Sequence, residues 1–153
     1  AVIGRIQLKR ISKWSKIRRA YAQAIWDTAK KLPGIRVPNL YCHSCEENCE
    51  NHQINCLHAA YKCYIFVEQG EEFRDQLLHK INNRGVPCYS GSCSEVYQEK
   101  AFKNNNLKPK NRLSIAKELG QTSLMFLCHP TLKKEEVKLT CRVLKETVLE
   151  MMG

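Results

Sequence analysis

The N-terminal part of the chain carries apolar side chains at helical spacing. At intervals of three or four residues stand Ile11, Trp14, Ile17, Tyr21, Ile25, Thr28 and Leu32. This spacing places side chains on one face of an α-helix. The cations that lie mostly off that face are Lys9, Lys13, Lys16 and Arg19. The pattern predicts a helix from Ile3 to Leu32, about 45 Å long, and Pro33-Gly34 ends it. Such a length suggests a connecting or interface helix.

Four further segments have the character of strands. Apolar and polar residues alternate from Ala60 to Val67, which predicts a strand with two distinct faces. One face carries Tyr61, Cys63, Ile65 and Val67, and the other carries Lys62, Tyr64 and Phe66. A second strand is predicted from Thr122 to Cys128, before Pro130. Shorter extended pieces are expected at Ile35 to Pro38 and Val86 to Tyr89.

Three shorter helices complete the pattern. Glu71 to Arg84 has acidic residues in its first turn and Gly85 at its left-handed cap. Leu113 to Leu119 is a short helix that we expect Gly120 to cap. Thr131 is the expected N-cap of the last helix, whose apolar face carries Val137, Cys141, Leu144, Val148 and Met151.

This order of elements predicts an α+β fold with two layers, in which helices pack on one face of a small, mainly antiparallel sheet. We expect a long connecting helix over residues 1–34 and a small C-terminal α/β domain over residues 35–153. A cysteine-rich insertion interrupts that domain at residues 39–58. Because the sequence starts at Ala1 and the predicted helix begins almost at once, we expect an upstream part to be missing.

Composition narrows the functional classes. Hydrophobic residues make up 43% of the chain and charged residues 26%, as in globular proteins. No segment reads as a membrane span or a signal peptide, so we expect a cytoplasmic location and no membrane contact. A net charge of +10 attracts anions, including nucleic acids. We favour a solvated basic face, because the cations are spread along the chain without an aromatic platform for single strands.

A cluster of cysteines is the clearest candidate for metal binding. Cys42, Cys45, Cys49 and Cys56 fall within a short polar stretch that also holds three histidines. Thiolates and imidazoles at short spacing suit a structural zinc site. The first pair has the separation of a zinc knuckle, whereas the second pair is too widely spaced for one. A divergent loop with unpaired cysteines remains the alternative.

The second half of the chain resembles the small domain of the DegT/DnrJ family of sugar aminotransferases. The resemblance rests on Phe73-Arg74-Asp75-Gln76-Leu77-Leu78, Asn83-Arg84-Gly85-Val86-Pro87, Gly91-Ser92-Cys93-Ser94-Glu95-Val96-Tyr97, Ala116-Lys117-Glu118-Leu119-Gly120 and His129-Pro130-Thr131-Leu132. The opening Ile3-Gly4-Arg5-Ile6-Gln7-Leu8 is similar to the long helix that leaves the family's large domain.

The resemblance implies the C-terminal domain of a fold-type-I enzyme that works as a homodimer. Such enzymes use pyridoxal phosphate to transfer an amino group from glutamate to a nucleotide-linked keto sugar, for polysaccharides or secondary metabolites. The lysine that forms the Schiff base and the Asp at the pyridine nitrogen belong to the large domain. We therefore expect the partner of this chain to be that upstream domain, and the chain alone to be inactive.

The resemblance also implies a role for the loop from Cys88 to Phe102, because the small domain closes over the active site. The polar candidates for binding the sugar are Tyr89, Ser92, Ser94, Glu95 and Tyr97. Hydroxyls and a carboxylate can hydrogen-bond a sugar, and a tyrosine ring can cover its apolar face. Many relatives carry a His here, where this chain has Ser-Cys-Ser-Glu, which leaves the contact pattern open. The alternative is that Ser92 and Ser94 only cap the following turn.

Two other functions remain open from the sequence. One is a small, basic nucleic-acid-binding module stapled by zinc, which would bind through its N-terminal helix and weaken steeply with salt. The other is a free-standing regulatory or scaffold domain. If the chain is a severed small domain, its long helix exposes an apolar face, so we expect self-association.

Overall fold

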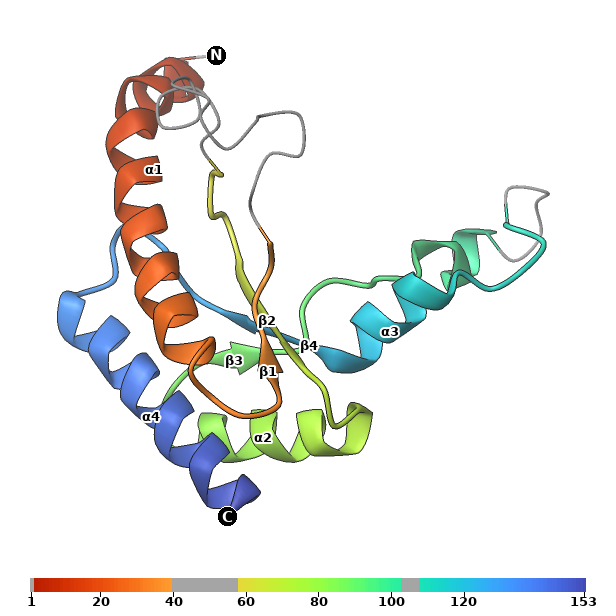
Figure 1. Ribbon diagram of the computed structural model, residues 1–153. Coiled ribbons are helices and arrows are strands. Elements are labelled where there is room, and N and C mark those ends of the chain that lie inside the picture. Colours follow the sequence, from red (N-terminus) through yellow and green to blue (C-terminus); the bar gives the residue numbers. More distant parts are fainter. Residues whose placement is uncertain (1, 40–57, 103–107) are drawn as a thin grey trace, which may run out of the picture.

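The structure, a computed structural model, describes residues 2–39, 58–102 and 108–153. Figure 1 shows the arrangement of its helices and strands. In chain order, these are α1 (Val2–Ala29), β1 (Ile35–Arg36), β2 (Cys63–Val67), α2 (Glu71–Asn83), β3 (Cys88–Tyr89), the 3-10 turns η2 (Val96–Gln98) and η3 (Lys100–Phe102), α3 (Ser114–Thr122), β4 (Ser123–Phe126) and α4 (Lys134–Met152).

The four strands form one antiparallel sheet in the order β1-β2-β4-β3. β2 and β4 are the central strands, and Cys63 of β2 stands opposite Phe126 of β4. β1 pairs with Phe66 and Val67, and no other described strand pairs with the first half of β2 on that side, which we call its free edge. The predicted α+β class with a small antiparallel sheet is confirmed.

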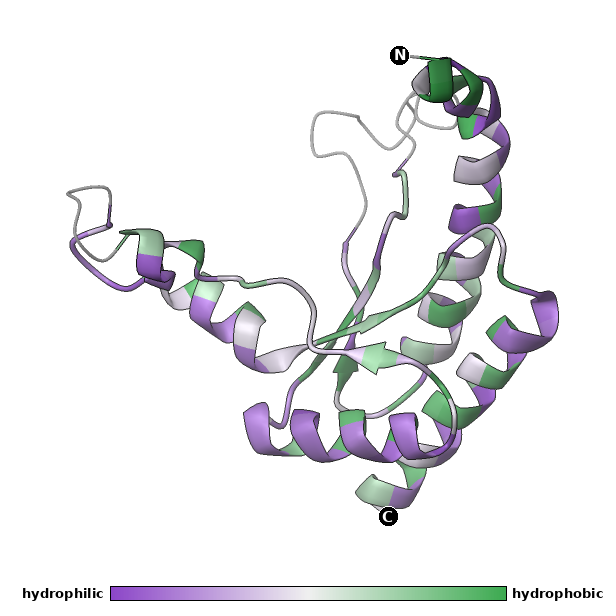
Figure 2. Ribbon diagram, turned by 180° about the vertical axis from the view of Figure 1, so that it is seen from behind, coloured by the Kyte–Doolittle hydropathy of each residue, from purple (hydrophilic) through white to green (hydrophobic). Residues whose placement is uncertain are grey.

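One face of the sheet forms the core together with three helices. Cys63, Ile65 and Val67 alternate along β2 and are buried, as the period of two in the sequence predicted. Leu124 and Phe126 join them from β4. α1 and α4 lie side by side, and α2 contacts β3 and β4. Figure 2 shows hydrophobic residues along the strands and on the inner sides of these helices.

The opposite face of the sheet carries larger and more polar side chains, and we call it the open face. Antiparallel partners lie on the same face, so Tyr64, Met125 and Tyr89 form one row across β2, β4 and β3. Phe66 is the next residue of β2 on this face, and the Arg36 guanidinium lies 4.5 Å from the centre of its ring. Tyr64 and Phe66 are half-buried, which leaves part of this face accessible.

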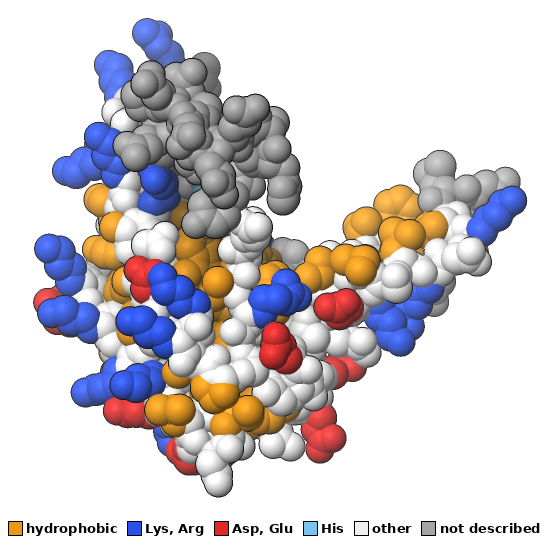
Figure 3. All heavy atoms as spheres, in the orientation of Figure 1, with side chains coloured by type: hydrophobic (Ala, Val, Ile, Leu, Met, Phe, Trp, Pro, Cys, Tyr) orange, Lys and Arg blue, Asp and Glu red, His pale blue; other side chains and the backbone are white. Residues whose placement is uncertain are grey.

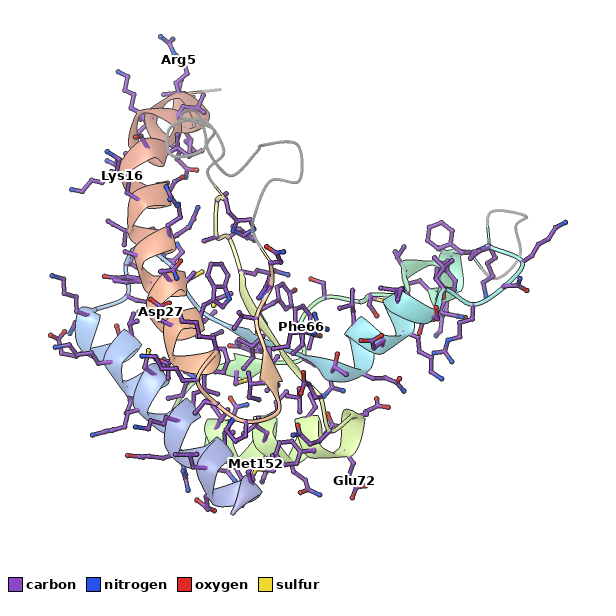
Figure 4. The ribbon with its side chains drawn as sticks, in the orientation of Figure 1. Arg5, Lys16, Asp27, Phe66, Glu72 and Met152 are labelled. Carbon is purple, nitrogen blue, oxygen red and sulfur yellow. The ribbon has the colours of Figure 1, made fainter. Side chains whose placement is uncertain are left out.

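The predicted helix Ile3 to Leu32 matches α1 closely, but only its C-terminal part is buried. Ile25 and Ala29 are fully enclosed, whereas Ile11 is 50% exposed and Ile3 is 74% exposed. Figure 3 shows cations crowding this helix, and Figure 4 shows Arg5 and Lys16 pointing away from the body. None of the described helices is long and apolar enough to cross a membrane.

Three sequence-based predictions about single residues are wrong. Tyr61 does not join the buried face of β2: it is 73% exposed, because the strand begins only at Cys63 and Ala60 has a left-handed φ of 47°. Gly120 does not cap α3 but lies within it. Thr131 is not the N-cap of α4. That position belongs to Lys133, whose N–H donates a 2.6 Å hydrogen bond to the carboxylate of Glu136.

Candidate functional site

The candidate residues take part in two hydrogen-bond networks. The first joins Ser92, in the loop after β3, to Tyr64 and Lys62 at the open face. The Ser92 N–H donates to the hydroxyl of Tyr64 at 3.3 Å, and Lys62 Nζ donates to the Ser92 Oγ at 2.5 Å. Ser92 therefore binds across the open face to β2, rather than capping η2. The N-cap of η2 is Glu95, which makes no side-chain capping bond.

Gly91 makes this approach possible in two ways. Its φ of +96° lies in the left-handed region, which favours glycine. A Cβ built at Gly91 would lie 2.6 Å from a ring carbon of Tyr64, so a side chain there would clash with the ring. The Tyr64 ring thus packs directly on the backbone of the loop.

The hydroxyl of Tyr64 has an altered acidity in this setting. Partial burial alone would raise its pKa, but the hydrogen bonds from the side chain and backbone of Ser92, together with the charge of Lys62, lower the pKa overall. Tyr89, from the same row of the open face, has 47% of its surface exposed. The Tyr64 phenol, the Ser92 hydroxyl and the Lys62 ammonium therefore meet on this side of the sheet, and Tyr89 lies on the same face across β4.

Glu95 and Tyr97 belong to a second network, on the arm formed by η2, η3 and α3. Arg112 donates to both carboxylate oxygens of Glu95, at 2.7 and 2.6 Å. The buried Tyr97 donates its hydroxyl proton to the same carboxylate at 2.5 Å and accepts a hydrogen bond from the N–H of Leu113 at 3.0 Å. The hydrogen bonds from Arg112, and then that from Tyr97, lower the pKa of Glu95 to about 2.

Ser94 lies between the two networks, against α3. A Cβ at Gly120 would meet Ser94 Oγ at 2.3 Å, so the glycine of α3 allows this close contact. The five predicted residues are therefore not one cluster in this structure. Tyr89 and Ser92 lie at the open face, whereas Glu95 and Tyr97 hold the arm together, and the carboxylate of Glu95 already has three donors.

A groove that the sequence did not single out runs beside the open face, at the free edge of β2. Its volume is about 510 Å³, and the described residues that line it are Trp26, Pro38, His58, Ala59, Ala60, Tyr61, Lys62, Tyr64 and Phe66. The indole N–H of Trp26 donates to the carbonyl of Tyr64 at 2.9 Å, which ties α1 to this edge. The aromatic residues in and before β2 were visible in the sequence, but the contribution of Trp26 depends on how α1 packs.

The predicted zinc ligands Cys42, Cys45, Cys49 and Cys56 lie outside the described residues. In the described parts of the chain, no group of three or more His, Cys, Asp or Glu side chains is placed to hold a metal ion. Cys63, Cys88 and Cys128 are buried free thiols, and desolvation raises the pKa of the Cys128 thiol to about 11. Buried thiols of this kind are packing groups.

Comparisons with known proteins agree on one family. The profile of the DegT/DnrJ/EryC1/StrS aminotransferase family matches residues 1–145. Among solved structures, the aminotransferase from Psychrobacter cryohalolentis is 40% identical in sequence, with a TM-score of 0.81, and the match covers 99% of this chain and 38% of that one. No curated protein matches the chain.

More distant structures share the fold. PseC of Helicobacter pylori, an aminotransferase involved in the biosynthesis of pseudoaminic acid, is 17% identical, with a TM-score of 0.72 over 96% of this chain and 36% of its own. A putative sugar aminotransferase from Streptococcus pneumoniae is 15% identical, with a TM-score of 0.74 over 98% of this chain and 35% of its own. This chain therefore spans well under half the length of the structures it matches, and it belongs to the DegT/DnrJ/EryC1/StrS aminotransferase family.

Proposed function

We propose that this chain is the C-terminal domain of a pyridoxal-phosphate-dependent aminotransferase that acts on a nucleotide-linked keto sugar, with glutamate as the amino donor. The observation that carries the proposal is the 40% identity to the Psychrobacter cryohalolentis aminotransferase over 99% of this chain. This family membership favours amino transfer over nucleic-acid binding as the function. We further propose that the parent enzyme is a cytoplasmic homodimer.

We propose that the residues of this chain do not by themselves complete a cofactor site. When bound, pyridoxal phosphate acts as an electron sink and needs a lysine for its imine and a carboxylate for its ring nitrogen. The lysine beside the open face is Lys62, which is hydrogen-bonded to Ser92. The carboxylate of Glu95, in the candidate loop, lies in the other network and is held by Arg112 and Tyr97. We propose that both cofactor-binding groups lie outside this chain, which is then inactive alone.

The role proposed for this chain is to bind and cover the substrate. Tyr89 and Ser92 present hydroxyls beside the open face, where they can hydrogen-bond the hydroxyls of a sugar. The half-buried rings of Tyr64 and Phe66 provide an apolar surface next to them. A domain that closes with this face inward would exclude water from the reacting carbon and orient the sugar. Glu95 and Tyr97 contribute by holding the shape of the arm.

A chimaeric enzyme tests the proposal. This chain would replace the matching C-terminal 38% of the Psychrobacter cryohalolentis aminotransferase. We expect the chimaera to bind pyridoxal phosphate and to consume glutamate with a nucleotide-linked keto sugar, whereas the isolated chain shows no Schiff-base absorbance after dialysis. A Schiff-base band on the isolated chain would contradict the placement of the lysine. A folded, cofactor-loaded chimaera that accepts no nucleotide-linked sugar would contradict the substrate class.

The matched variants of the chimaera are Ser92→Ala and Ser114→Ala. Ser92 lies in the network of the open face, whereas Ser114 is the exposed first residue of α3. We expect Ser92→Ala to raise KM for the sugar about tenfold, as the loss of one hydrogen bond predicts, and Ser114→Ala to leave it unchanged. Equal effects of both variants would count against a sugar contact at Ser92.

A further inference from the structure

β3 lies at one edge of the sheet, and a side chain binds its outer edge. No described strand pairs with that edge, because β3 follows only β4 in the order of the sheet. The carboxamide of Asn82, near the end of α2, takes the place of a strand there. Its Oδ1 accepts a hydrogen bond from the N–H of Cys88 at 3.2 Å, and its Nδ2 donates to the carbonyl of Cys88 at 2.8 Å. One amide therefore satisfies both backbone groups of Cys88, as a neighbouring strand would.

The carboxamide of Asn82 is itself fixed in direction. Its Nδ2 also donates to the carbonyl of Leu78, one turn earlier in α2, at 2.9 Å. The two hydrogens of an amide nitrogen can serve these two acceptors at once. Because the Asn82 side chain is exposed, hydrogen bonds rather than core packing hold it in place. Asn82 therefore ties β3 to α2 without being part of the core.

A second side chain holds the backbone two residues later. The Oγ of Ser123, at the start of β4, donates to the carbonyl of Ser90 at 2.8 Å. Ser123 is only 6% exposed, and its own carbonyl accepts a 3.3 Å hydrogen bond from the buried guanidinium of Arg74 in α2. The same nitrogen of Arg74 donates to the carbonyl of Gly120 at 3.0 Å. The anchor of Ser90 is thus itself held from α2.

The two anchored residues flank Tyr89. Tyr89 pairs with Met125 of β4 and presents its side chain to the open face, whereas the buried Cys88 points into the core. The bonds from Asn82 and Ser123 to this segment go to backbone atoms, so they fix the path of the chain through Tyr89. A binding group that is displaced by about 1 Å can lose most of its effect, so the path of the backbone decides whether the Tyr89 hydroxyl meets a ligand.

We propose that Asn82 is a positioning residue for substrate binding: it holds β3 so that Tyr89 presents its hydroxyl to the sugar, with Ser123 as the second anchor of the same segment. The inference rests on the proposed function, because it assigns the sugar contact to Tyr89. Asn82 acts through the backbone of Cys88 and does not touch the sugar.

Steady-state kinetics of the chimaeric enzyme test this role. Asn82→Ala removes both bonds to Cys88 and leaves no cavity in the core, because the side chain is exposed. We expect KM for the nucleotide-linked keto sugar to rise about threefold to tenfold, as the loss of one or two hydrogen bonds implies, while kcat changes by less than about twofold. Asn83→Ala is the matched control, because its amide lies 2.9 Å from His79 Nε2 rather than at β3, and it should leave KM unchanged.

A double-variant cycle separates positioning from a general loosening of the domain. Tyr89→Phe removes the hydroxyl that Asn82 is proposed to position. Asn82→Ala should therefore raise KM in the wild-type background and have little further effect in the Tyr89→Phe background. An equal rise of KM in both backgrounds would indicate that Asn82 only stabilises the fold, and would overturn the proposal.

Hydrogen exchange on the 153-residue chain tests the anchor without amino transfer. The N–H of Cys88 should exchange at least about tenfold faster in Asn82→Ala than in the wild type, because it loses its acceptor and opens to solvent more readily. In Asn83→Ala its exchange should remain slow. Unchanged protection of this N–H in Asn82→Ala would show that Asn82 does not hold β3, and the proposal would be wrong.

Failure of this proposal is distinguishable from failure of the proposed function. An active chimaera with the same KM in Asn82→Ala and Asn83→Ala would overturn the positioning role and leave the proposed function intact. A chimaera that accepts no nucleotide-linked sugar would overturn the proposed function, and with it the sugar contact on which the positioning role rests. The exchange of the Cys88 N–H would still decide whether Asn82 anchors β3.

Discussion

Arg112 holds Glu95 through two parallel hydrogen bonds, from Nε at 2.7 Å and from Nη2 at 2.6 Å. The two residues stand on either side of the 3-10 turns η2 and η3, so the pair closes the arm into a loop. Two donors on one planar guanidinium fix the orientation of the carboxylate as well as its distance. The candidate loop is thereby anchored at Glu95, while its Ser92 end rests on the open face.

The acidity of Glu95 tests this anchor. Its pKa is about 2, against an ordinary value of 4.5, chiefly because of the hydrogen bonds from Arg112. We predict that Arg112→Met raises the pKa of Glu95 toward 4.5, measured by NMR titration of the side-chain carboxyl carbon. Arg142→Met, on the exposed side of α4, is the control and should change nothing. An unchanged pKa in Arg112→Met would mean that the pair does not form in solution.

The same pair gives a pH dependence of stability. Because the carboxyl of Glu95 has a lower pKa in the folded chain than in the unfolded chain, the unfolded chain binds more protons between these values. The contribution of Glu95 is therefore complete above pH 4.5 and is lost as the pH falls toward about 2. The unfolding free energies of the wild-type chain and of Arg112→Met, measured with urea, should therefore approach each other as the pH falls through this range.

Glycine at position 91 is predicted to matter more than glycine at position 85. Both have positive φ, +96° and +77°, but a Cβ at Gly85 meets nothing within 4 Å, whereas one at Gly91 meets the Tyr64 ring. Gly85→Ala should cost about 1–2 kcal/mol of unfolding free energy from backbone strain alone. Gly91→Ala should cost about 1–3 kcal/mol more, because the ring must also move.

Urea denaturation of both glycine variants measures this difference. The fluorescence or NMR signal of Tyr64 should change in Gly91→Ala and not in Gly85→Ala. Equal losses of stability in the two variants would show that the loop does not rest on Tyr64 as described.

The exposed N-terminal half of α1 leads us to predict self-association. Its first turns carry apolar side chains that are between 47% and 74% exposed, namely Val2, Ile3, Ile6, Leu8 and Ile11. Neighbouring apolar side chains on one exposed helix favour association. Sedimentation velocity at increasing concentration should show species larger than a monomer. Ile3→Glu should reduce them, while Ile115→Glu, at a similarly exposed site on α3, should not. A monomer at all concentrations would contradict this prediction.

Zinc binding by the cysteine cluster stays a prediction, with a loop of unpaired cysteines as its alternative. A structural site predicts about one zinc per chain by elemental analysis, because four thiolates fill one tetrahedral shell. The double variant Cys42→Ser/Cys45→Ser should then lose the metal. The control variant Cys93→Ser, which removes an exposed thiol of the described part of the chain, should retain it. A chain purified without chelator that holds no zinc would support the alternative.

Much of the fold was readable from local patterns. The period of two in β2 placed Cys63, Ile65 and Val67 on one face, and the acidic start and Gly85 end delimited α2. These features depend on neighbours within a few residues, which a sequence displays directly. Positions where local rules compete were less readable: Thr131 suits a helix N-cap, but the carboxylate of Glu136 places that cap at Lys133.

The sequence by itself determined the helices, the strands, the two-faced pattern of β2 and the family resemblance, because periodicity and ordered motifs are local properties of the chain. Only the tertiary structure decided which candidate residues act together. Glu95 meets Arg112 seventeen residues away, and Ser92 meets Lys62 thirty residues away. The groove beside Tyr64 also needs Trp26 from the distant helix α1. These contacts arise from how the sheet, the arm and α1 pack, which no spacing along the chain encodes.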